Sequence, residues 1–400
     1  MKIKSIILLL ASVALVGCGG SGSTSSATDA CTELSSDTFS CDGMLNDLVA
    51  DGVLPIVQDL ETKLNDLDSA VATYCSDDSK LPEAKAAWTA VMAPLQQLQV
   101  MNFGPNTSSD SGLLPLYDWQ TAHPVNIDTA IAQNALAAES KLSVIDNEKD
   151  LVAVEYVLFD VAAVQIGASE NPNTTAWRAG KTDEEIQQDR CDYANLVTSS
   201  LKAHGESLNE AWQQYDVLAS SSTSQAAANK VAEALFYIDK ITKDEKIKTV
   251  LPQADDNESA FDASVLESQF AKQSKEAILN NLIGARIILT LTDTKDGLDG
   301  YLIAAGQQDV AVDMVLTLAV AISNLNLMTG DAFDAVNNAN DEAACKNYSS
   351  GSLSYTTANS DIELFCALQH NIKNFTDILK GDFTFLTSFT VPASASGDND

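Results

Sequence analysis

The chain has 400 residues, a length typical of two domains or three. It carries 56 Asp and Glu residues against 23 Lys and Arg, a formal net charge of −33, and this charge argues against nucleic acid as a partner. Hydrophobic residues make up 45% of the chain, so a sizeable core can form and wholesale disorder is excluded.

The first seventeen residues have the form of a secretory signal. Lys2 and Lys4 precede a short apolar run, which is too short to span a bilayer as a stable helix. The run ends in Leu15-Val16-Gly17-Cys18, which resembles a bacterial lipobox, so we expect cleavage before Cys18 and lipidation of that cysteine. The alternative is an ordinary signal peptide followed by a chance cysteine. Gly19 is not the aspartate associated with inner-membrane retention, which favours a lipid anchor in the outer membrane of a Gram-negative bacterium, on its periplasmic or outer face.

Six cysteines remain after the lipidated one, and an even number in an exported protein indicates disulfides. We expect the pairs Cys31–Cys41, Cys75–Cys191 and Cys345–Cys366. The first and third close short local loops, whereas the second ties the end of one helix to the start of a distant one. No Cys-x-x-Cys or Cys/His cluster supports a zinc finger or a redox centre.

Apolar residues recur at helical spacing along nearly the whole chain. This period predicts helices over residues 45–67, 80–100, 127–142, 147–164, 182–215, 225–242, 264–291, 309–326, 331–346 and 361–379. Polar segments rich in Gly, Pro, Asn or Ser predict loops at 102–115, 167–180, 220–224 and 252–262. No series of segments alternates at period 2, so the predicted fold is all-α with two helical-bundle domains.

The predicted domain organisation follows these breaks. The parts are a lipoprotein signal peptide at 1–17, a tether with a local disulfide at 18–42, an N-terminal bundle at 43–220, a C-terminal bundle at 221–392 and a disordered tail at 393–400. The junction between the bundles lies near 216–224 or 250–262.

One acidic side chain stands in an unusual setting. Glu155 is the lone carboxylate in Leu151-Val152-Ala153-Val154-Glu155-Tyr156-Val157-Leu158-Phe159, so we expect it to be at least partly buried. A buried charge is costly unless it is paired or coordinates an ion. Arg190 and Arg286 are candidate partners, and a structural ion pair or a position at a helix edge is the equally weighted alternative to a functional site.

Histidines are scarce in this sequence. None of the three has a second histidine or a carboxylate at the helical i+3 or i+4 spacing of a metal site, so each is more typical of a surface or capping position. They are His123, His204 and His370.

Several short motifs, taken in order, resemble the imelysin family from about residue 45 to residue 386. They are Trp88, Phe103-Gly104-Pro105, Tyr117-Asp118-Trp119, Arg190-Cys191-x-Tyr193, Asn209-Glu210-Ala211-Trp212 and Glu267-Ser268-x-Phe270. The resemblance implies two helical-bundle domains, export, and association with iron uptake or with a peptidase activity. It also implies a Gly-x-His-x-x-Glu motif on a helix, whose His and Glu face the same way and could share a metal ion.

This chain departs from that motif. Aligning Glu155 with the motif glutamate places Asp150 at the glycine position and Val152 at the histidine position. Valine cannot bind a metal ion, and a catalytic zinc site usually takes three protein ligands. The loss argues against peptidase chemistry at this motif, while the retained Glu155 favours a binding or structural role.

Three functions therefore stay open. The first is a non-catalytic, surface-anchored binding protein for a cation, a small ligand or a partner protein, linked to iron or other cation uptake. The second is a metallopeptidase whose site is assembled from Glu155 with His123 or His204, and the third is a structural envelope lipoprotein without a ligand site. A divalent or ferric cation is the candidate cofactor, with Glu155 as its one candidate ligand. The candidate pocket residues are Asp150, Val152, Glu155, Arg190, Arg286, Trp119, Glu267 and Ser268.

Overall fold

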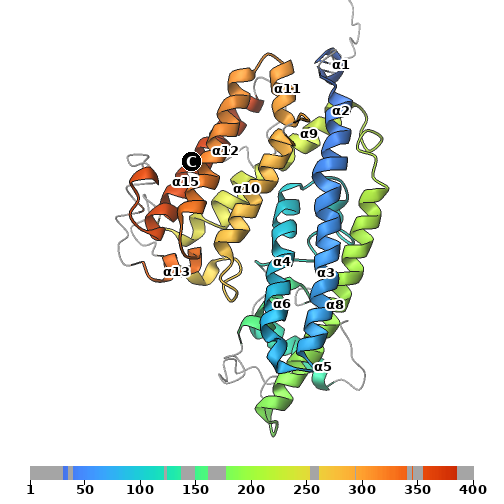
Figure 1. The fold of residues 1–400 in the computed structure, drawn as a ribbon, viewed down its shortest axis with the longest axis vertical. Helices are drawn as coiled ribbons and strands as arrows, with labels where there is room; N and C mark the ends of the chain where they lie inside the picture. Colours follow the sequence, from blue (N-terminus) through green and yellow to red (C-terminus); the bar gives the residue numbers. More distant parts are fainter. Residues whose placement is uncertain are drawn as a thin grey trace, which may run out of the picture.

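The structure, a computed structural model, describes residues 30–34, 39–120, 124–136, 149–160, 177–252, 261–292, 294–339, 345 and 355–384. Within these ranges the regular structure is helical, and the β pairing consists of an isolated bridge between Thr292 and Lys295. The predicted all-α fold is confirmed (Figure 1). The predicted signal peptide, Cys18, His123 and the predicted tail lie outside the described residues.

The first group of helices is built on one long rod, in which three consecutive segments continue each other (Figure 1). They are α2 (Cys41–Asp47), the π-helical turn η1 (Leu48–Val53) and α3 (Leu54–Tyr74). The rod packs against two other long helices, α4 (Leu81–Val100) and α8 (Asp183–Gln213). Two shorter helices, α5 (Pro124–Leu136) and α6 (Leu151–Phe159), pack against α8.

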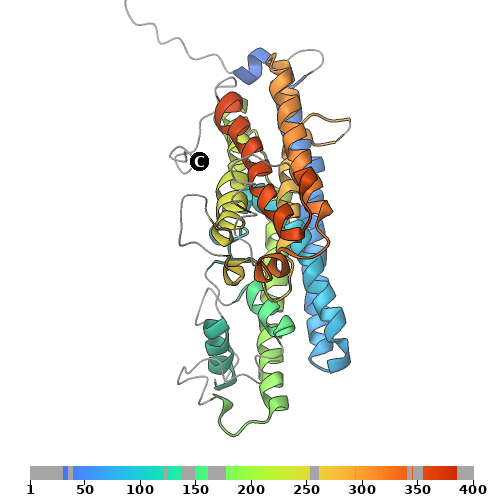
Figure 2. The same cartoon turned by 90° about the vertical axis from the view of Figure 1, so that its left-hand side faces the viewer.

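The second group follows α8 in the chain. It comprises α10 (Ser274–Thr290), α11 (Leu298–Ala304), α12 (Gln308–Leu327), α13 (Ala332–Asn337), α15 (Asp361–Ile378) and the π-helical turn η10 (Leu379–Phe383). Figure 2 shows α15 alongside α12, with which it packs. Between α8 and α10 the chain forms α9 (Ser224–Ala234) and the π-helix η6 (Ile238–Glu245). Short helices are α1 (Ala30–Leu34), η2 (Asp78–Lys80), η3 (Gly104–Thr107), η7 (Lys248–Val250), η8 (Ala263–Val265) and η9 (Tyr355–Thr357).

Helices α4 and α10 join the two groups along one close contact. At Gly284 of α10, a Cβ atom would lie 2.5 Å from the carbonyl oxygen of Gln97. Because backbone atoms cannot yield as a flexible side chain can, only glycine permits this approach.

Among the described helices, α12 is long and apolar enough to cross a membrane. It packs against α10, α11 and α15, and buries Ala311, Met314, Leu318, Ala321 and Leu325. The inner face of α12 is therefore apolar because it packs against the neighbouring helices of the bundle.

The three predicted disulfides are present, with Cα–Cα distances of 5.4 Å for Cys31–Cys41, 5.3 Å for Cys75–Cys191 and 4.9 Å for Cys345–Cys366. Cys75 caps the C-terminus of α3, and Cys191 lies in the third turn of α8. The second bridge therefore fixes one end of the α3–α8 contact, as the sequence predicted.

The predicted helix over 264–291 is wrong in its first ten residues. After the single turn η8 the chain runs through an irregular loop, residues 266–273, and α10 begins only at Ser274. Ser268 and Lys272 have φ angles of 52° and 53°, in the left-handed region that a right-handed helix excludes. The predicted helix over 225–242 is likewise divided, because α9 ends at Ala234 and η6 takes a π-helical path.

Candidate functional site

Helix α6 is capped at its N-terminus by Asp150, the residue that the predicted alignment places at the motif glycine. The Asp150 Oδ1 atom accepts hydrogen bonds from the backbone N–H groups of Val152 (3.0 Å) and Ala153 (3.2 Å), which is an N-cap. Its Oδ2 atom accepts another from Asp118 N–H, 2.8 Å away. Burial raises the pKa of Asp150 to about 7, against the lowering effect of these three bonds.

Both ends of α6 are held by side chains from the first helical group. Trp88 Nε1 donates to the carbonyl oxygen of Leu151 at 2.8 Å. At the other end, Arg190 donates to the carbonyl oxygens of Tyr156 and Asp160 at 3.2 and 3.3 Å. The guanidinium also lies 4.7 Å from the centre of the Tyr156 ring. Residues of two family motifs thus fix the helix that carries Glu155.

Glu155 is buried, with 1% of its surface exposed. Its Oε1 atom accepts two hydrogen bonds from consecutive backbone N–H groups, Phe270 at 3.1 Å and Ala271 at 2.9 Å. Burial raises the pKa of Glu155 to about 8, although the two amide bonds act in the opposite direction. Because both bonds go to Oε1, Oε2 can carry the proton without disturbing them.

The loop 266–273 is shaped around this carboxyl group. The left-handed residues Ser268 and Lys272 lie on either side of Phe270 and Ala271, and the turn between them brings two successive N–H groups to the same carboxyl oxygen. The Phe270 ring packs edge-on against Tyr156 of α6, with ring centres 5.4 Å apart. We call this arrangement the Glu155 nest.

A buried polar network lies beside the Glu155 nest. Glu267 forms an ion pair with Lys246 at 2.8 Å and accepts a hydrogen bond from Gln96 Nε2 at 2.6 Å. Lys246 also donates to Gln96 Oε1 at 2.8 Å and to Asn281 Oδ1 at 2.9 Å. All four side chains are at most 2% exposed. Burial lowers the pKa of Lys246, and the Glu267 carboxylate opposes that shift.

The nest and the network are linked to a tyrosine that also faces a surface hollow. The Tyr117 hydroxyl lies 3.1 Å from Ser268 Oγ, and burial raises the pKa of Tyr117 well above its usual range, with Glu267 and Glu155 adding to the shift. Tyr117 also lines a hollow of about 480 Å³, together with Trp119 and Tyr237.

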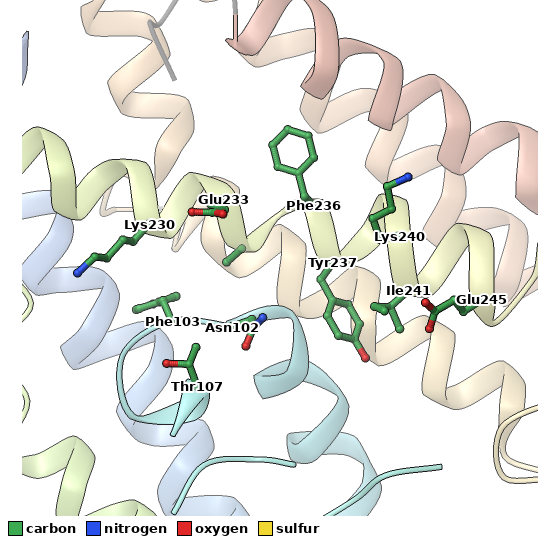
Figure 3. Close-up of a pocket in the computed structure, with 11 residues that line it drawn as sticks. Asn102, Phe103, Thr107, Lys230, Glu233, Phe236, Tyr237, Lys240, Ile241 and Glu245 are labelled. Carbon is green, nitrogen blue, oxygen red and sulfur yellow. The ribbon is translucent and has the colours of Figure 1, made fainter. Parts of the chain in front are cut away.

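A second hollow of about 670 Å³, shown in Figure 3, adjoins the first. The two share the lining residues Asn102, Thr107, Tyr237, Ile241 and Glu245. Together they form one groove between α9–η6 on one side and the segment 99–120 on the other, which we call the η6 groove. Its wall includes the π-helix η6, and π-helical turns frequently occur at functional sites.

The segment that forms the other wall of the η6 groove is firmly supported. Trp212 Nε1 donates to Asn106 Oδ1 at 2.8 Å, and the Trp212 ring packs edge-on against Phe103 with centres 5.7 Å apart. Gly104 has a φ of 56°, and a Cβ there would lie 3.1 Å from the Trp212 ring. Two further family motifs therefore shape this wall.

The structure separates the predicted site residues into those that meet and those that do not. Asp150 and Glu155 lie on α6, Glu267 and Ser268 on the adjoining loop, and half-buried Trp119 lines the η6 groove. Val152, at the motif histidine position, is 7% exposed and lies in the first turn of α6.

The two candidate arginine partners of Glu155 lie elsewhere. Arg190 lies 3.6 Å from Asp128 Oδ1, and Arg286 is exposed on α10. Within the described part of the chain the Glu155 carboxyl makes no ion pair, so the proposed pairing with arginine was wrong. The hydrogen-bond partners of Glu155 are backbone N–H groups, which cannot be predicted from residue types.

The described histidines take structural positions. His204 Nε2 lies 2.7 Å from the carbonyl oxygen of Gly112, and the side chain lines a third hollow of about 420 Å³ with Asp118 and Asp150. His370 is half-buried on α15. Among the residues that the structure describes, no three His, Cys, Asp or Glu side chains lie close enough together to hold a metal ion.

Sequence reasoning missed Lys246, Gln96 and Tyr237. Lys246 stands in a run of charged residues that reads as solvated surface, and Gln96 and Tyr237 occupy ordinary helical positions. Of the network residues that were missed, only Asn281 could have been found from the sequence, because it is an amide among the apolar residues of α10.

The described residues form two groups of helices, with a buried glutamate on a short helix of the first group, and this arrangement defines the class of fold. The imelysin family matches residues 53–355, and the chain belongs to this family. An imelysin-like protein from Psychrobacter arcticum 273-4 shares the fold, with a TM-score of 0.61 and 17% identity over 88% of this chain and 96% of that one. A putative iron-regulated protein A precursor from Parabacteroides distasonis ATCC 8503 has a TM-score of 0.58 and 15% identity, over 88% of this chain and 95% of that one. No curated protein matches.

Proposed function

We propose that the protein is a non-catalytic, lipid-anchored binding protein of the bacterial envelope, and that its ligand occupies the η6 groove. The observation that carries this proposal is the groove itself, which lies over a buried network and has firmly supported walls. A preformed concave site with a few fixed polar groups is typical of ligand-binding proteins.

Two features of α6 support a non-catalytic role. The motif histidine is replaced by Val152, and Glu155 uses Oε1 to hold two backbone amides. With its pKa raised to about 8 by burial, Glu155 is largely protonated at neutral pH, and a protonated carboxyl group is a poor metal ligand. In the proposed function Glu155 is therefore a positioning residue for the loop 266–273.

The proposed location rests on the Leu15-Val16-Gly17-Cys18 motif. Lipidation at Cys18 would anchor the chain through a tether rich in Gly, Ser and Thr, which is flexible by composition. We propose attachment to the outer membrane, since Gly19 follows the lipidated cysteine.

Iron or other cation uptake is a second candidate role, favoured by one specific observation. The neighbour from Parabacteroides distasonis is titled a putative iron-regulated protein A precursor. A net charge of −33 would also raise the local cation concentration around this chain.

A calorimetric titration separates these roles. The mature protein and its Glu155→Gln variant are titrated with ferrous iron, ferric citrate, zinc, copper and calcium. Micromolar or tighter binding that is lost in the variant would support cation uptake through Glu155. Weak binding at many sites, indifferent to the substitution, is what we expect from a solvated acidic surface, and it would remove the cation role. Proteolysis by the wild-type protein that a chelator abolishes would overturn the non-catalytic proposal.

A further inference from the structure

The shape of the η6 groove indicates the kind of ligand it fits. One wall runs from Lys230 on α9 to Glu245 on η6, a length of about 20 Å at a helical rise of about 1.5 Å per residue. Its two hollows of about 670 and 480 Å³ adjoin each other and share Tyr237 and Ile241 in their linings. A site of this length suits an extended organic molecule of several units, and it is far larger than a single ion needs.

The charges along the groove nearly balance one another. Lys230 and Lys240 are set against three carboxylates, Glu233 and Glu245 (Figure 3) and Asp118. Three of these five side chains also have partners within the protein. Lys230 donates to the carbonyl oxygen of Ser220 at 3.1 Å, Lys240 lies 3.7 Å from Asp244, and Glu245 accepts a hydrogen bond from Gln120. In a chain with a net charge of −33, a groove with one excess carboxylate disfavours an anionic ligand, because the groove and the molecule as a whole would repel it.

The uncharged polar groups of the groove both donate and accept hydrogen bonds. They are the amides of Gln99 and Asn102 and the hydroxyls of Thr107, Ser108 and Ser109. Amides and hydroxyls carry donors and acceptors side by side. A ligand hydroxyl group has the same dual character, so a molecule with many hydroxyl groups matches the wall formed by the segment 99–120.

Aromatic rings provide the apolar part of the lining. Phe103, Tyr237 and Trp119 come from different parts of the groove and lie among its polar groups. Tyr237 is held by a hydrogen bond from its hydroxyl to Gln99 Oε1 at 3.0 Å, and Phe103 is held by Trp212. Tyr237 and Trp119 are half-buried and keep apolar surface on which the C–H faces of pyranose rings can stack, whereas Phe103 is 3% exposed and supports the wall.

From these observations we infer that the η6 groove binds a neutral oligosaccharide. The inference rests on the proposed function, since it names the ligand class of the same groove. A peptide is the competing ligand. Peptides usually bind by adding a strand to a sheet edge or by laying a helix into an apolar groove. The described residues offer no sheet edge here, and the groove walls alternate polar and aromatic groups.

The test uses the mature, unlipidated protein on an array of neutral glucans, mannans, galactans and N-acetylglucosamine oligomers, followed by calorimetry with the hexasaccharide that binds. We expect saturable binding that Asn102→Ala and Trp119→Ala each weaken tenfold or more. Asn102 is exposed, so its substitution should leave the fold intact. Asn326→Ala, an exposed amide on α12 away from the groove, is the matched control and should bind as the wild type does.

Two results would overturn the oligosaccharide inference. One is the absence of saturable binding across the array, and the other is binding that neither groove variant changes. An acetylated neutral hexapeptide, titrated in parallel, identifies a peptide site if it binds instead. The proposed function survives such a result if the peptide binds in the groove, and it falls if neither the sugars nor the peptide binds there. Cation binding that Glu155→Gln abolishes would leave only the second candidate role.

Discussion

The buried carboxyl group of Glu155 is stabilised by two backbone hydrogen bonds and has no charged partner among the described residues. Its apolar neighbours on α6 made burial predictable from the sequence, since a single carboxylate on such a short helix has no exposed face to occupy. Its partners were not predictable. They are backbone N–H groups of a loop 115 residues away, in a left-handed conformation that neither Ser268 nor Lys272 announces by residue type.

The raised pKa of Glu155 makes the stability of the protein depend on pH. Burial lifts this pKa from 4.5 in the unfolded chain to about 8, so the folded state holds a proton that the unfolded state releases. The free energy of unfolding should therefore fall as the pH rises from about 4.5 to 8, at up to about 1.4 kcal/mol per pH unit. Asp150, raised from 3.8 to about 7, should act in the same direction over its own range.

Urea unfolding at pH 5, 7 and 8.5 checks this prediction with Glu155→Gln. The amide keeps an oxygen for the two N–H groups and cannot titrate, so the variant should lose less stability between pH 5 and 8.5. Glu206→Gln, at an exposed position on α8, is the control and should follow the wild-type profile. Parallel profiles for Glu155→Gln and the wild type would contradict the assignment of the pH dependence to Glu155.

At the scale of elements, the helical period of apolar residues located the long helices well. It failed where contacts with distant residues determine the backbone conformation. Helices α4 and α8 begin and end within two residues of the predicted bounds, because apolar spacing and caps are local signals. The loop 266–273 and the π-helix η6 read as regular helix, since their conformations depend on Glu155 and on packing from distant segments. The groove stayed hidden for the same reason, because its walls come from residues 99–120 and 230–245, which are unremarkable when taken singly.

The contact between α4 and α10 should depend on a single glycine. In Gly284→Ala the new methyl group would lie 2.5 Å from Gln97 O and 3.0 Å from Gln97 Cα, and these backbone atoms can move only with their helix. We expect a loss of about 1 to 3 kcal/mol in the free energy of unfolding, despite the better helix propensity of alanine.

Gly381→Ala provides the matched control for this contact. No heavy atom lies within 4 Å of a Cβ built at Gly381, so the substitution should be neutral or stabilise by up to about 1 kcal/mol. Urea unfolding of the two variants measures the difference. Equal stabilities would show that the α4–α10 contact relaxes to admit the methyl group.

For the whole molecule, composition and period predicted an all-helical fold, and cysteine spacing predicted the three bridges. The division into bundles at 43–220 and 221–392 stays a prediction. Helix–helix contacts run through α4 and α10 from one group into the other, and no sequence pattern shows which faces of two helices meet.

The Cys75–Cys191 bridge should contribute most to stability among the three. It spans 116 residues, and loop-closure entropy for a span of this order corresponds to about 4 kcal/mol or more. The paired substitution Cys75→Ala with Cys191→Ala should lower the free energy of unfolding by that order. The pair Cys345→Ala with Cys366→Ala opens a loop of 21 residues and should cost less, about 3 kcal/mol. Calorimetric melting of both double variants ranks them, and the reverse order would refute the loop-closure account.

The N-cap of α6 has a consequence for any attempt to rebuild the family motif in this chain. Restoring glycine at position 150 would leave the N–H groups of Asp118 and Val152 without the carboxylate that both now use, at a cost of about 1 to 3 kcal/mol for each unpaired buried group. Restoring histidine at position 152 would place a larger polar ring where a 7% exposed valine now packs. Each substitution by itself is therefore expected to destabilise this chain, so the glycine and histidine of the motif cannot be introduced at positions 150 and 152 without a cost in stability.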